Sequence, residues 1–219
     1  MLRAAYRRFR GRPTLISTSA EAAAQMTGPY DWNPMPHRLD VRCPKCGEPA
    51  RFEFATAVRV KRTDEREFFE RSSHFDCRTI GEGTRSRWVA ALFHATLHGA
   101  PEQVIADLPP GYEPSHWRPP RNGHRCFGTD AGAVRCPSCG LGRRHTLRWP
   151  HDAHYQIEVR GHVLWAFHRE SALELRQYIA SDHRRREGFR WELMLRHVPG
   201  VFLSSKVRST VVERLDRLL

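Results

Sequence analysis

The sequence lacks several features that would place it in a common class of protein. No apolar stretch approaches the ~20 residues that a helix needs to cross a bilayer, so we expect no transmembrane segment. A P-loop, a dinucleotide-binding glycine fingerprint and a GxSxG nucleophile elbow are all missing, which removes the common signatures of nucleotide-dependent enzymes and hydrolases. No secretory signal is visible. We therefore expect a soluble, cytoplasmic protein whose cysteines are reduced.

Lysine and the acidic residues are also scarce relative to arginine. Among the 36 basic residues the only lysines are Lys45, Lys61 and Lys206, and 24 acidic residues leave a net charge of +12. A GC-rich genome would explain the ratio of arginine to lysine, but not the excess of basic over acidic residues. Guanidinium groups bind phosphate through paired hydrogen bonds and stack on bases. The excess of positive charge therefore favours nucleic acid as a partner.

What the sequence does contain is a repeated cysteine motif. The heptapeptide Val-Arg-Cys-Pro-Lys-Cys-Gly at Val41–Gly47 recurs as Val-Arg-Cys-Pro-Ser-Cys-Gly at Val134–Gly140. Two cysteines separated by two residues can place both thiolates about 2.3 Å from one tetrahedral Zn²⁺. The proline stiffens the turn, and the last glycine permits the positive φ with which such a turn closes. Each copy therefore predicts a zinc knuckle, and structural Zn²⁺ is the expected cofactor.

Two ligand arrangements fit the spacing of the cysteines. In the first, the knuckles face each other and one Zn²⁺ is bound by Cys43, Cys46, Cys136 and Cys139. In the second, two Zn²⁺ ions bind and each knuckle is completed by nearby residues. The added ligands would be His74 and Cys77 for the first knuckle, and His124 and Cys126 for the second. We favour the second arrangement, because it uses all six cysteines and closes no long loop.

The pattern along the chain predicts an α+β fold that is rich in β-structure, with zinc-ribbon hairpins, an inserted helix and a helical C-terminal end. We expect four segments: a flexible basic tail, the first knuckle with its hairpin, a helix with a proline-rich connector, and the second knuckle with a hairpin and helices. Their bounds are residues 1–36, 37–80, 81–122 and 123–219.

The first half is expected to combine a hairpin with a helix. Strands are predicted at Arg51–Val60 and Phe68–Ile80, on either side of a charged turn, and the second would carry ligands back towards the first knuckle. A helix is predicted over Thr84–His98, since its apolar residues share one face and Gly99 follows. The proline-rich segment Pro101–Arg121 is expected to be an extended connector.

The second half is expected to begin with strands and to end with helices. The predicted elements are a basic strand at Arg143–Trp149, a hairpin of Tyr155–Val159 with Val163–Phe167, and helices at about Glu170–Ala180 and Lys206–Leu219. The segment Trp191–Val198 fits a strand or a helix equally well.

The two knuckles and the segment Arg143–Trp165 resemble the bacterial proteins known as TFIIB-type zinc ribbons. The segment includes Leu147–Ala153 (Leu-Arg-Trp-Pro-His-Asp-Ala) and Val159–Ala166 (Val-Arg-Gly-His-Val-Leu-Trp-Ala), although the knuckles alone are diagnostic. The resemblance implies a ribbon of hairpins held by zinc. It also implies an adaptor role in transcription or in another nucleic-acid complex.

The expected function is that of a non-catalytic adaptor that binds DNA or RNA. Arginine beside tryptophan can combine phosphate contacts with base stacking. The residues expected to bind are Arg143, Arg144, His145, Arg148 and Trp149 on one strand and Arg184, Arg185 and Arg186 in a turn. The alternative is a protein-interaction subunit that does not touch nucleic acid, since a run of arginine is often only a solvated turn.

Two groups of histidines could carry chemistry instead. His151, Asp152 and His154 could form a base–carboxylate cluster or a metal site, and would then make the protein a small metal-dependent nuclease. The pattern of an HNH nuclease is not visible around them, so a polar loop is the preferred interpretation. His94 and His98 lie one helical turn apart, but the glutamate of the HExxH metallopeptidase motif is missing.

Overall fold

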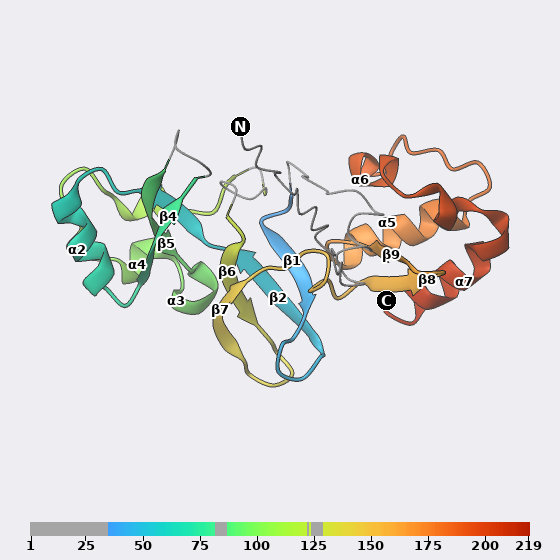
Figure 1. Cartoon of the computed structure of the whole chain (residues 1–219), viewed down its shortest axis with the longest axis horizontal. Helices are drawn as coiled ribbons and strands as arrows, with labels where there is room; N and C mark the ends of the chain where they lie inside the picture. Colours follow the sequence, from blue (N-terminus) through green and yellow to red (C-terminus); the bar gives the residue numbers. More distant parts are fainter. Residues whose placement is uncertain (1–34, 82–86, 122, 124–128) are drawn as a thin grey trace, which may run out of the picture.

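The computed structural model describes residues 35–81, 87–121, 123 and 129–219, and combines helices with antiparallel sheets (Figure 1). The expected α+β class is confirmed. The predicted tail lies outside the described residues except for Met35 and Pro36, as do His124 and Cys126. No helix in the described part of the chain is long and apolar enough to cross a membrane.

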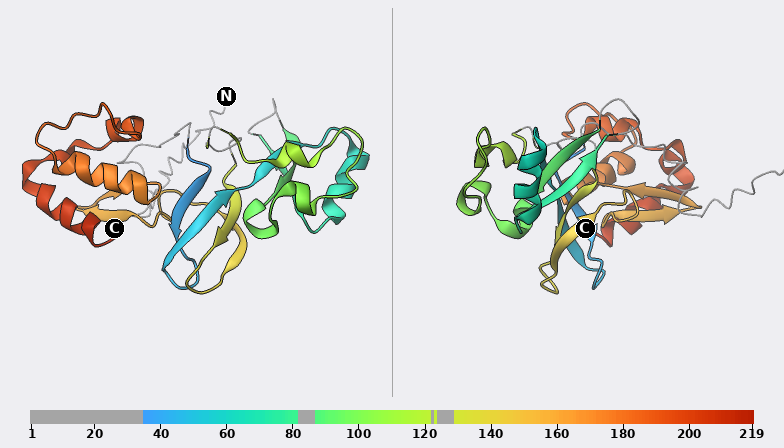
Figure 2. Two further views of the ribbon diagram at one scale, coloured as in Figure 1. Left: turned by 180° about the vertical axis from the view of Figure 1, so that it is seen from behind. Right: turned by 60° about the vertical axis from the view of Figure 1, so that its left-hand side comes forward.

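A four-stranded antiparallel sheet forms the centre of the molecule, in the order β1-β2-β6-β7. Its strands are β1 (Arg38–Arg42), β2 (Pro49–Phe54), β6 (Ala131–Arg135) and β7 (Gly142–Thr146). Each knuckle is the turn of one hairpin, and the pairing of β2 with β6 joins the two hairpins. Figure 2 (right) shows the two hairpin tips next to each other, although they lie far apart in the sequence.

The two faces of the central sheet differ because side chains alternate along each strand. One face is apolar and buried, with Leu39, Phe52 and Val134 in one row across three strands. The next row, on the opposite face, carries Arg51 beside Arg135. The sheet therefore has one face for the core and one charged face.

A three-stranded sheet lies between the two hairpins in the sequence and to one side of them in space (Figure 1). Its order is β3-β5-β4. The region contains β3 (Thr56–Arg59), α2 (Thr63–Arg71), β4 (Phe75–Ile80), β5 (Trp88–Phe93), α3 (Ala95–His98), α4 (Pro101–Val104) and the 3-10 helix η1 (Pro114–Trp117). Its own core contains several aromatic side chains: Phe69 and Phe75 pack edge to face, and Trp117 packs against both at a tilt.

Three predictions for this inserted region are wrong. The charged turn and the start of the next strand are the helix α2, in which acidic residues occupy the first turn and Phe69 is buried. The predicted helix over 84–98 is mainly β5, a continuous apolar run between two strands, which periodicity cannot distinguish from a buried helix. The proline-rich connector is packed, since Trp117 is fully buried and its Nε1–H donates to the carbonyl of Ala91 at 2.9 Å.

The C-terminal region follows the predictions closely. It contains β8 (Gln156–Val159), β9 (His162–Trp165), α5 (Arg169–Ala180), α6 (Glu192–Arg196), the 3-10 helix η2 (Gly200–Leu203) and α7 (Ser205–Asp216). The hairpin turns at Arg160 and Gly161, both with positive φ, and the ambiguous segment around Trp191 becomes the helix α6. Apolar residues from α5 and α7 pack in one cluster with those of the central sheet.

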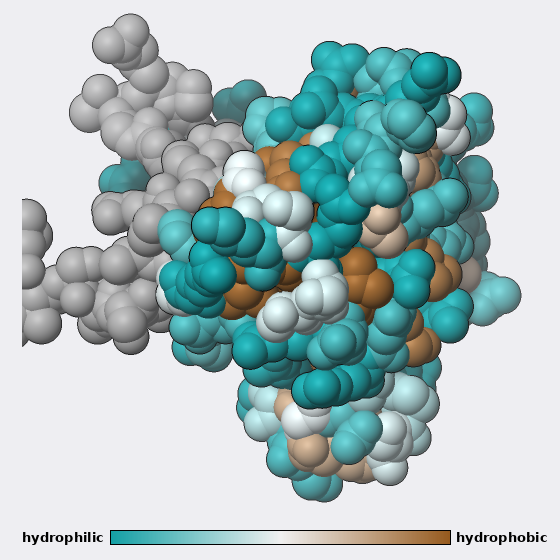
Figure 3. Space-filling view, turned by 90° about the vertical axis from the view of Figure 1, so that its right-hand side faces the viewer, coloured by the Kyte–Doolittle hydropathy of each residue, from teal (hydrophilic) through white to brown (hydrophobic). Residues whose placement is uncertain are grey.

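The outer face of the C-terminal region is mixed in character. Figure 3 shows apolar residues there as separate areas between polar ones. Among the described residues, the large apolar side chains that are exposed are Leu173 and Leu193. The region is tied to β1 by backbone hydrogen bonds, including that from Asp40 N–H to the carbonyl of Phe167 at 2.8 Å.

Candidate metal centre

Four cysteines meet where the two hairpins end. The Sγ atoms of Cys43 and Cys139 are 3.6 Å apart, those of Cys46 and Cys136 are 3.7 Å apart, and all four lie within 4.8 Å of one another. Sulfurs at the corners of a tetrahedron, each 2.3 Å from a central Zn²⁺, are about 3.8 Å apart. The distances are far longer than a disulfide bond of about 2.0 Å. The four sulfurs therefore fit a tetrahedral thiolate metal site.

Both knuckles are built by the same backbone hydrogen bonds. In the first, Cys43 N–H donates to the carbonyl of Glu48 at 2.8 Å, and Gly47 N–H donates to that of Cys43 at 2.9 Å. In the second, Cys136 pairs with Leu141 at 2.8 Å and Gly140 with Cys136 at 3.1 Å. The closing glycines have φ of 80° and 70°, as the motif predicts. The repeated heptapeptide thus gives one local structure twice.

The electrostatics of the cluster also favour a cation. Burial opposes ionisation of Cys43, but N–H donors of its own turn and the neighbouring thiols lower its pKa to about 6. At Cys46 an N–H donor lowers the pKa, but burial and the other three cysteines outweigh it and raise the pKa to about 12. Four adjacent thiols cannot all lose their protons while nothing balances the charge. A divalent cation at their centre would remove this conflict.

The structure differs from the local ligand arrangement that we favoured. Cys77 lies on β4 opposite Ala91, and the ring of His74 packs against that of His98, so neither belongs to the cysteine cluster. The two ligand positions that the local arrangement gave to His74 and Cys77 are occupied by Cys136 and Cys139 of the second knuckle. The long loop between them costs little more than a short one, because closure entropy grows only with the logarithm of loop length. Within the described ranges, no other group of His, Cys, Asp and Glu converges in this way.

A large cleft adjoins the second knuckle on the charged face of the central sheet. Its volume is about 1160 Å³, and it lies between the sheet, the segment from α3 to α4, and Arg118 with Pro119. Four arginines line it: Arg38, Arg51, Arg118 and Arg135. Arg38 pairs with Glu53 at 3.0 Å, and Arg118 pairs with Glu102.

Glu53 is a buried carboxylate in the lining of this cleft. Burial alone would raise its pKa, but His37, the hydroxyl of Thr96 and the charge of Arg38 lower it to about 2. The Nε2 atom of His37 lies 3.3 Å from Oε1 of Glu53, and Thr96 donates to Oε2. The carboxylate is therefore ionised at neutral pH and already has partners.

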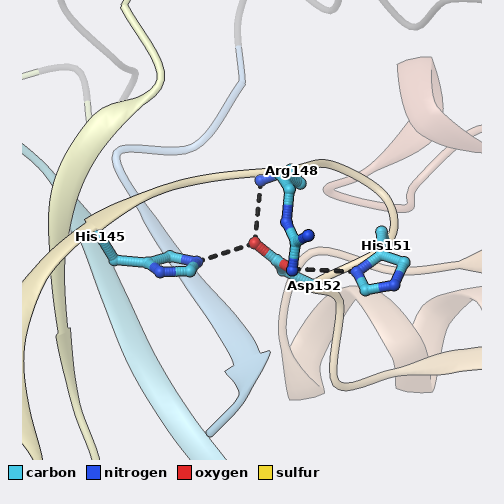
Figure 4. Close-up of polar contacts among 4 residues, drawn as sticks. All are labelled: His145, Arg148, His151 and Asp152. Carbon is cyan, nitrogen blue, oxygen red and sulfur yellow. Dashed lines mark hydrogen bonds and ion pairs between the residues drawn. The ribbon is translucent and has the colours of Figure 1, made fainter. Parts of the chain in front are cut away.

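A smaller pocket adjoins the first knuckle on the other side of the sheet. It measures about 370 Å³ and is lined by Cys43, Arg42, Arg148 and several polar side chains, which are His145, His151, Asp152, Gln156 and Glu158. Figure 4 shows the carboxylate of Asp152 between the rings of His145 and His151. Burial would raise the pKa of Asp152, but hydrogen bonds from Arg148 N–H and the two histidines lower it.

The residues predicted to bind nucleic acid do not form one surface. Arg143, Arg144 and Arg148 are all exposed, but Arg144 also donates to the backbone carbonyl of Phe75 at 3.1 Å and so ties β7 to the inserted region. His145 binds Asp152. The indole of Trp149 packs against two core aromatic rings, with centroid distances of 5.1 Å and 5.7 Å, so it is not a free stacking platform.

The three arginines of the predicted basic turn, Arg184, Arg185 and Arg186, also differ in exposure. Arg185 is exposed, whereas Arg186 Nε donates to the hydroxyl of Tyr178 at 3.2 Å and lies over its ring. Arg184 is half-buried. Sequence reasoning missed the pair of Arg51 and Arg135, because only the pairing of β2 with β6 places them side by side. The only local signal for this pair in the sequence was Arg135, which directly precedes Cys136.

Comparison of the chain with models of protein families, with curated proteins and with solved structures finds no match. What the protein does must therefore follow from the geometry of its own sites.

Proposed function

We propose that the protein is a zinc ribbon in which one structural Zn²⁺ is bound by Cys43, Cys46, Cys136 and Cys139. The support is the near-tetrahedral spacing of the four sulfurs and their repeated, rigid turns. Thiolates are the ligands of structural zinc sites, and four protein ligands leave no coordination position for water or substrate. The metal in this proposal holds the two hairpin tips together and takes no part in a reaction.

The metal site stands at the edge of a surface that is suited to phosphate. Arg51 and Arg135 lie directly opposite each other on neighbouring strands, are exposed, and face the same cleft. Like charges in such a position destabilise a sheet by repulsion. An anion bound between the two guanidinium groups would remove the repulsion, and this pair is the observation that carries the functional proposal.

The other charges of the cleft leave these two arginines as its available cations. Glu53 and Glu102 are paired with Arg38 and Arg118. Asp40 lies opposite Arg51 on β1 and accepts a hydrogen bond from the backbone of Arg169, and it forms no ion pair with Arg51. Among the described residues neither Arg51 nor Arg135 has an ion-pair partner. Guanidinium groups bind phosphate oxygens in pairs. The protein is accordingly a nucleic-acid adaptor whose zinc-ribbon sheet contacts the phosphate backbone.

The proposal is tested by the salt dependence of binding. Fluorescence anisotropy would measure the affinity for labelled single-stranded and duplex DNA and RNA between about 50 and 200 mM salt. Each phosphate contact contributes a slope of roughly 0.7 to 0.9 in log affinity against log salt. The double variant Arg51→Gln/Arg135→Gln should weaken binding at least tenfold and lower the slope by roughly 1 to 2.

Arg87→Gln/Arg185→Gln is the matched control, since it removes two exposed arginines outside the cleft. It should change the affinity by less than about twofold if the cleft is the binding surface. Wild-type protein that binds no nucleic acid at low salt would refute the proposal. Equal losses in the double variant and the control would show that only net charge matters.

A further inference from the structure

The pocket beside the first knuckle contains a buried carboxylate with an unusual number of donors. Asp152 is 7% exposed and accepts hydrogen bonds from the backbone N–H of Arg148 at 2.9 Å, from Nε2 of His145 at 2.8 Å and from Nδ1 of His151 at 3.1 Å. An ionised carboxylate only accepts hydrogen bonds, so each histidine directs an N–H to it. The carboxylate therefore sets the tautomer of both imidazole rings.

The two histidines differ in their exposure and therefore in the role of their hydrogen bond to Asp152. The side chain of His145 is 14% exposed and its ring packs edge-on against Phe52, so its contact with Asp152 is structural. The side chain of His151 is 63% exposed, and an exposed pair of this kind adds little stability. Its Nδ1–H is directed to Asp152, so that in the neutral ring Nε2 has no proton. His151 is thus an oriented base at the surface of the pocket.

The other polar groups of the pocket are suited to a phosphodiester. Arg42 and Arg148 line the same pocket of about 370 Å³, a size at the lower end of ordinary ligand sites. The side chain of Arg148 is largely exposed, with its Nη2 3.5 Å from Asp152. Guanidinium groups so placed would stabilise the negative charge that develops on a phosphate during substitution. The pocket thus combines one base with two cations, and the carboxylate of Glu158 also lines it.

We propose that this pocket cleaves RNA, with His151 as the general base that activates the ribose 2′-hydroxyl; the proposal rests on the nucleic-acid binding inferred above and requires the strand to pass from the arginine cleft to the opposite side of the sheet. The 2′-hydroxyl proton moves to Nε2 of His151, a bond forms between O2′ and phosphorus, and the bond between phosphorus and O5′ breaks. O5′ takes a proton from water, and the resulting hydroxide takes the proton back from His151. The products are a 2′,3′-cyclic phosphate and a 5′-hydroxyl, and no other reactant is consumed.

Asp152 is the positioning residue in this step, and His154 has no part in it. The ring of His154 packs edge-on against Tyr155, away from the hydrogen bonds of Asp152, although both histidines were candidates in the sequence. Asp152→Asn would weaken the preference of His151 for its present tautomer. We expect it to lower kcat with little change in KM, while zinc content and RNA affinity are retained.

The experiment follows the cleavage of a fluorescent RNA of about 20 nucleotides and of the matching DNA on denaturing gels, with the intact zinc-loaded protein. Wild-type protein should cleave the RNA to cyclic-phosphate ends and leave the DNA intact. His151→Ala should lower the rate by about 10²- to 10⁴-fold, the usual contribution of a general base, and added imidazole should restore part of it. His183→Ala, at another exposed histidine, is the matched control and should cleave as wild type does.

Each outcome separates this proposal from the one on which it rests. RNA that is bound but not cleaved by wild-type protein would overturn the cleavage proposal alone, as would equal cleavage by wild type and His151→Ala. Cleavage of the DNA at a similar rate would overturn the role of the 2′-hydroxyl. Wild-type protein that binds no RNA would overturn nucleic-acid binding itself. Because His151 is exposed, its variant should fold, and zinc content checks this.

Discussion

The hairpin tips of the central sheet and the inserted three-stranded region are held together in different ways. At the first tip the residues from Pro44 to Pro49 are all exposed, and only Cys43 before them and Ala50 after them are buried. The inserted region has a core of fully or largely buried aromatic rings around Phe69 and Trp117. We therefore expect the hairpin tips to depend on a metal bound by their thiolates, whereas the inserted region is stabilised by apolar packing.

The largest expected effect is at the tips. Cys136→Ser should abolish zinc binding and unfold the ends of both hairpins, because zinc binding contributes on the order of 10–16 kcal/mol in small zinc-finger peptides. Native mass spectrometry would give the zinc content, and hydrogen exchange would report on Val41–Ala50. Cys77→Ser is the matched control and should keep the full zinc content, since Cys77 is outside the cluster. Zinc loss in the control would contradict the shared site.

The converse variant is Trp117→Ala in the inserted region. Truncating a fully buried tryptophan costs about 3–5 kcal/mol, and here the donor to the carbonyl of Ala91 is also lost. Hydrogen exchange should accelerate in β4 and β5, while zinc content stays unchanged. His116→Ala, at the exposed residue next to Trp117, is the control. If Trp117→Ala released the metal, the two regions would not be stabilised independently.

A smaller effect is expected where the two hairpins join. Gly132 of β6 has no side chain, and a Cβ there would lie 2.3 Å from the carbonyl oxygen of Glu53 and from the ring of Phe52. Gly132→Ala should therefore separate β2 from β6 and cost about 1–3 kcal/mol, as overpacking usually does. Thermal unfolding would measure the loss. Gly200→Ala, where a Cβ meets nothing within 4 Å, should leave the melting temperature almost unchanged.

The last prediction concerns the dependence of stability on pH at Glu53. Its pKa is lowered to about 2, below the value of about 4.3 in an unfolded chain, so its contribution is complete above the unfolded value and is lost as pH falls towards 2. The difference in unfolding free energy between wild type and Glu53→Gln should shrink over that range. Urea unfolding at several pH values would measure it. A difference that does not change with pH would disprove the ionic role.

Local signals in the sequence were sufficient for several elements. The repeated heptapeptide predicted both knuckle turns with their positive-φ glycines, because proline, glycine and cysteine spacing act within a few residues. The hairpin over Gln156–Trp165 and the helices α5 and α7 were also predicted, since periodicity and turn chemistry agree there. In the inserted region β3 and β4 lie within predicted strands, but β5 was not predicted, because it is an apolar run without a distinguishing period.

The sequence by itself determined two turns that each present two thiolates, a basic surface, and the helical C-terminal end. Only the tertiary structure decided which thiolates share a site, because the pairing of β2 with β6 brings Cys46 within 3.7 Å of Cys136 across 90 residues. The same register placed Arg51 beside Arg135, and the packing of the loop after β7 placed Asp152 between two histidines. Strand register and packing depend on the whole buried surface, and no local window of the sequence contains that information.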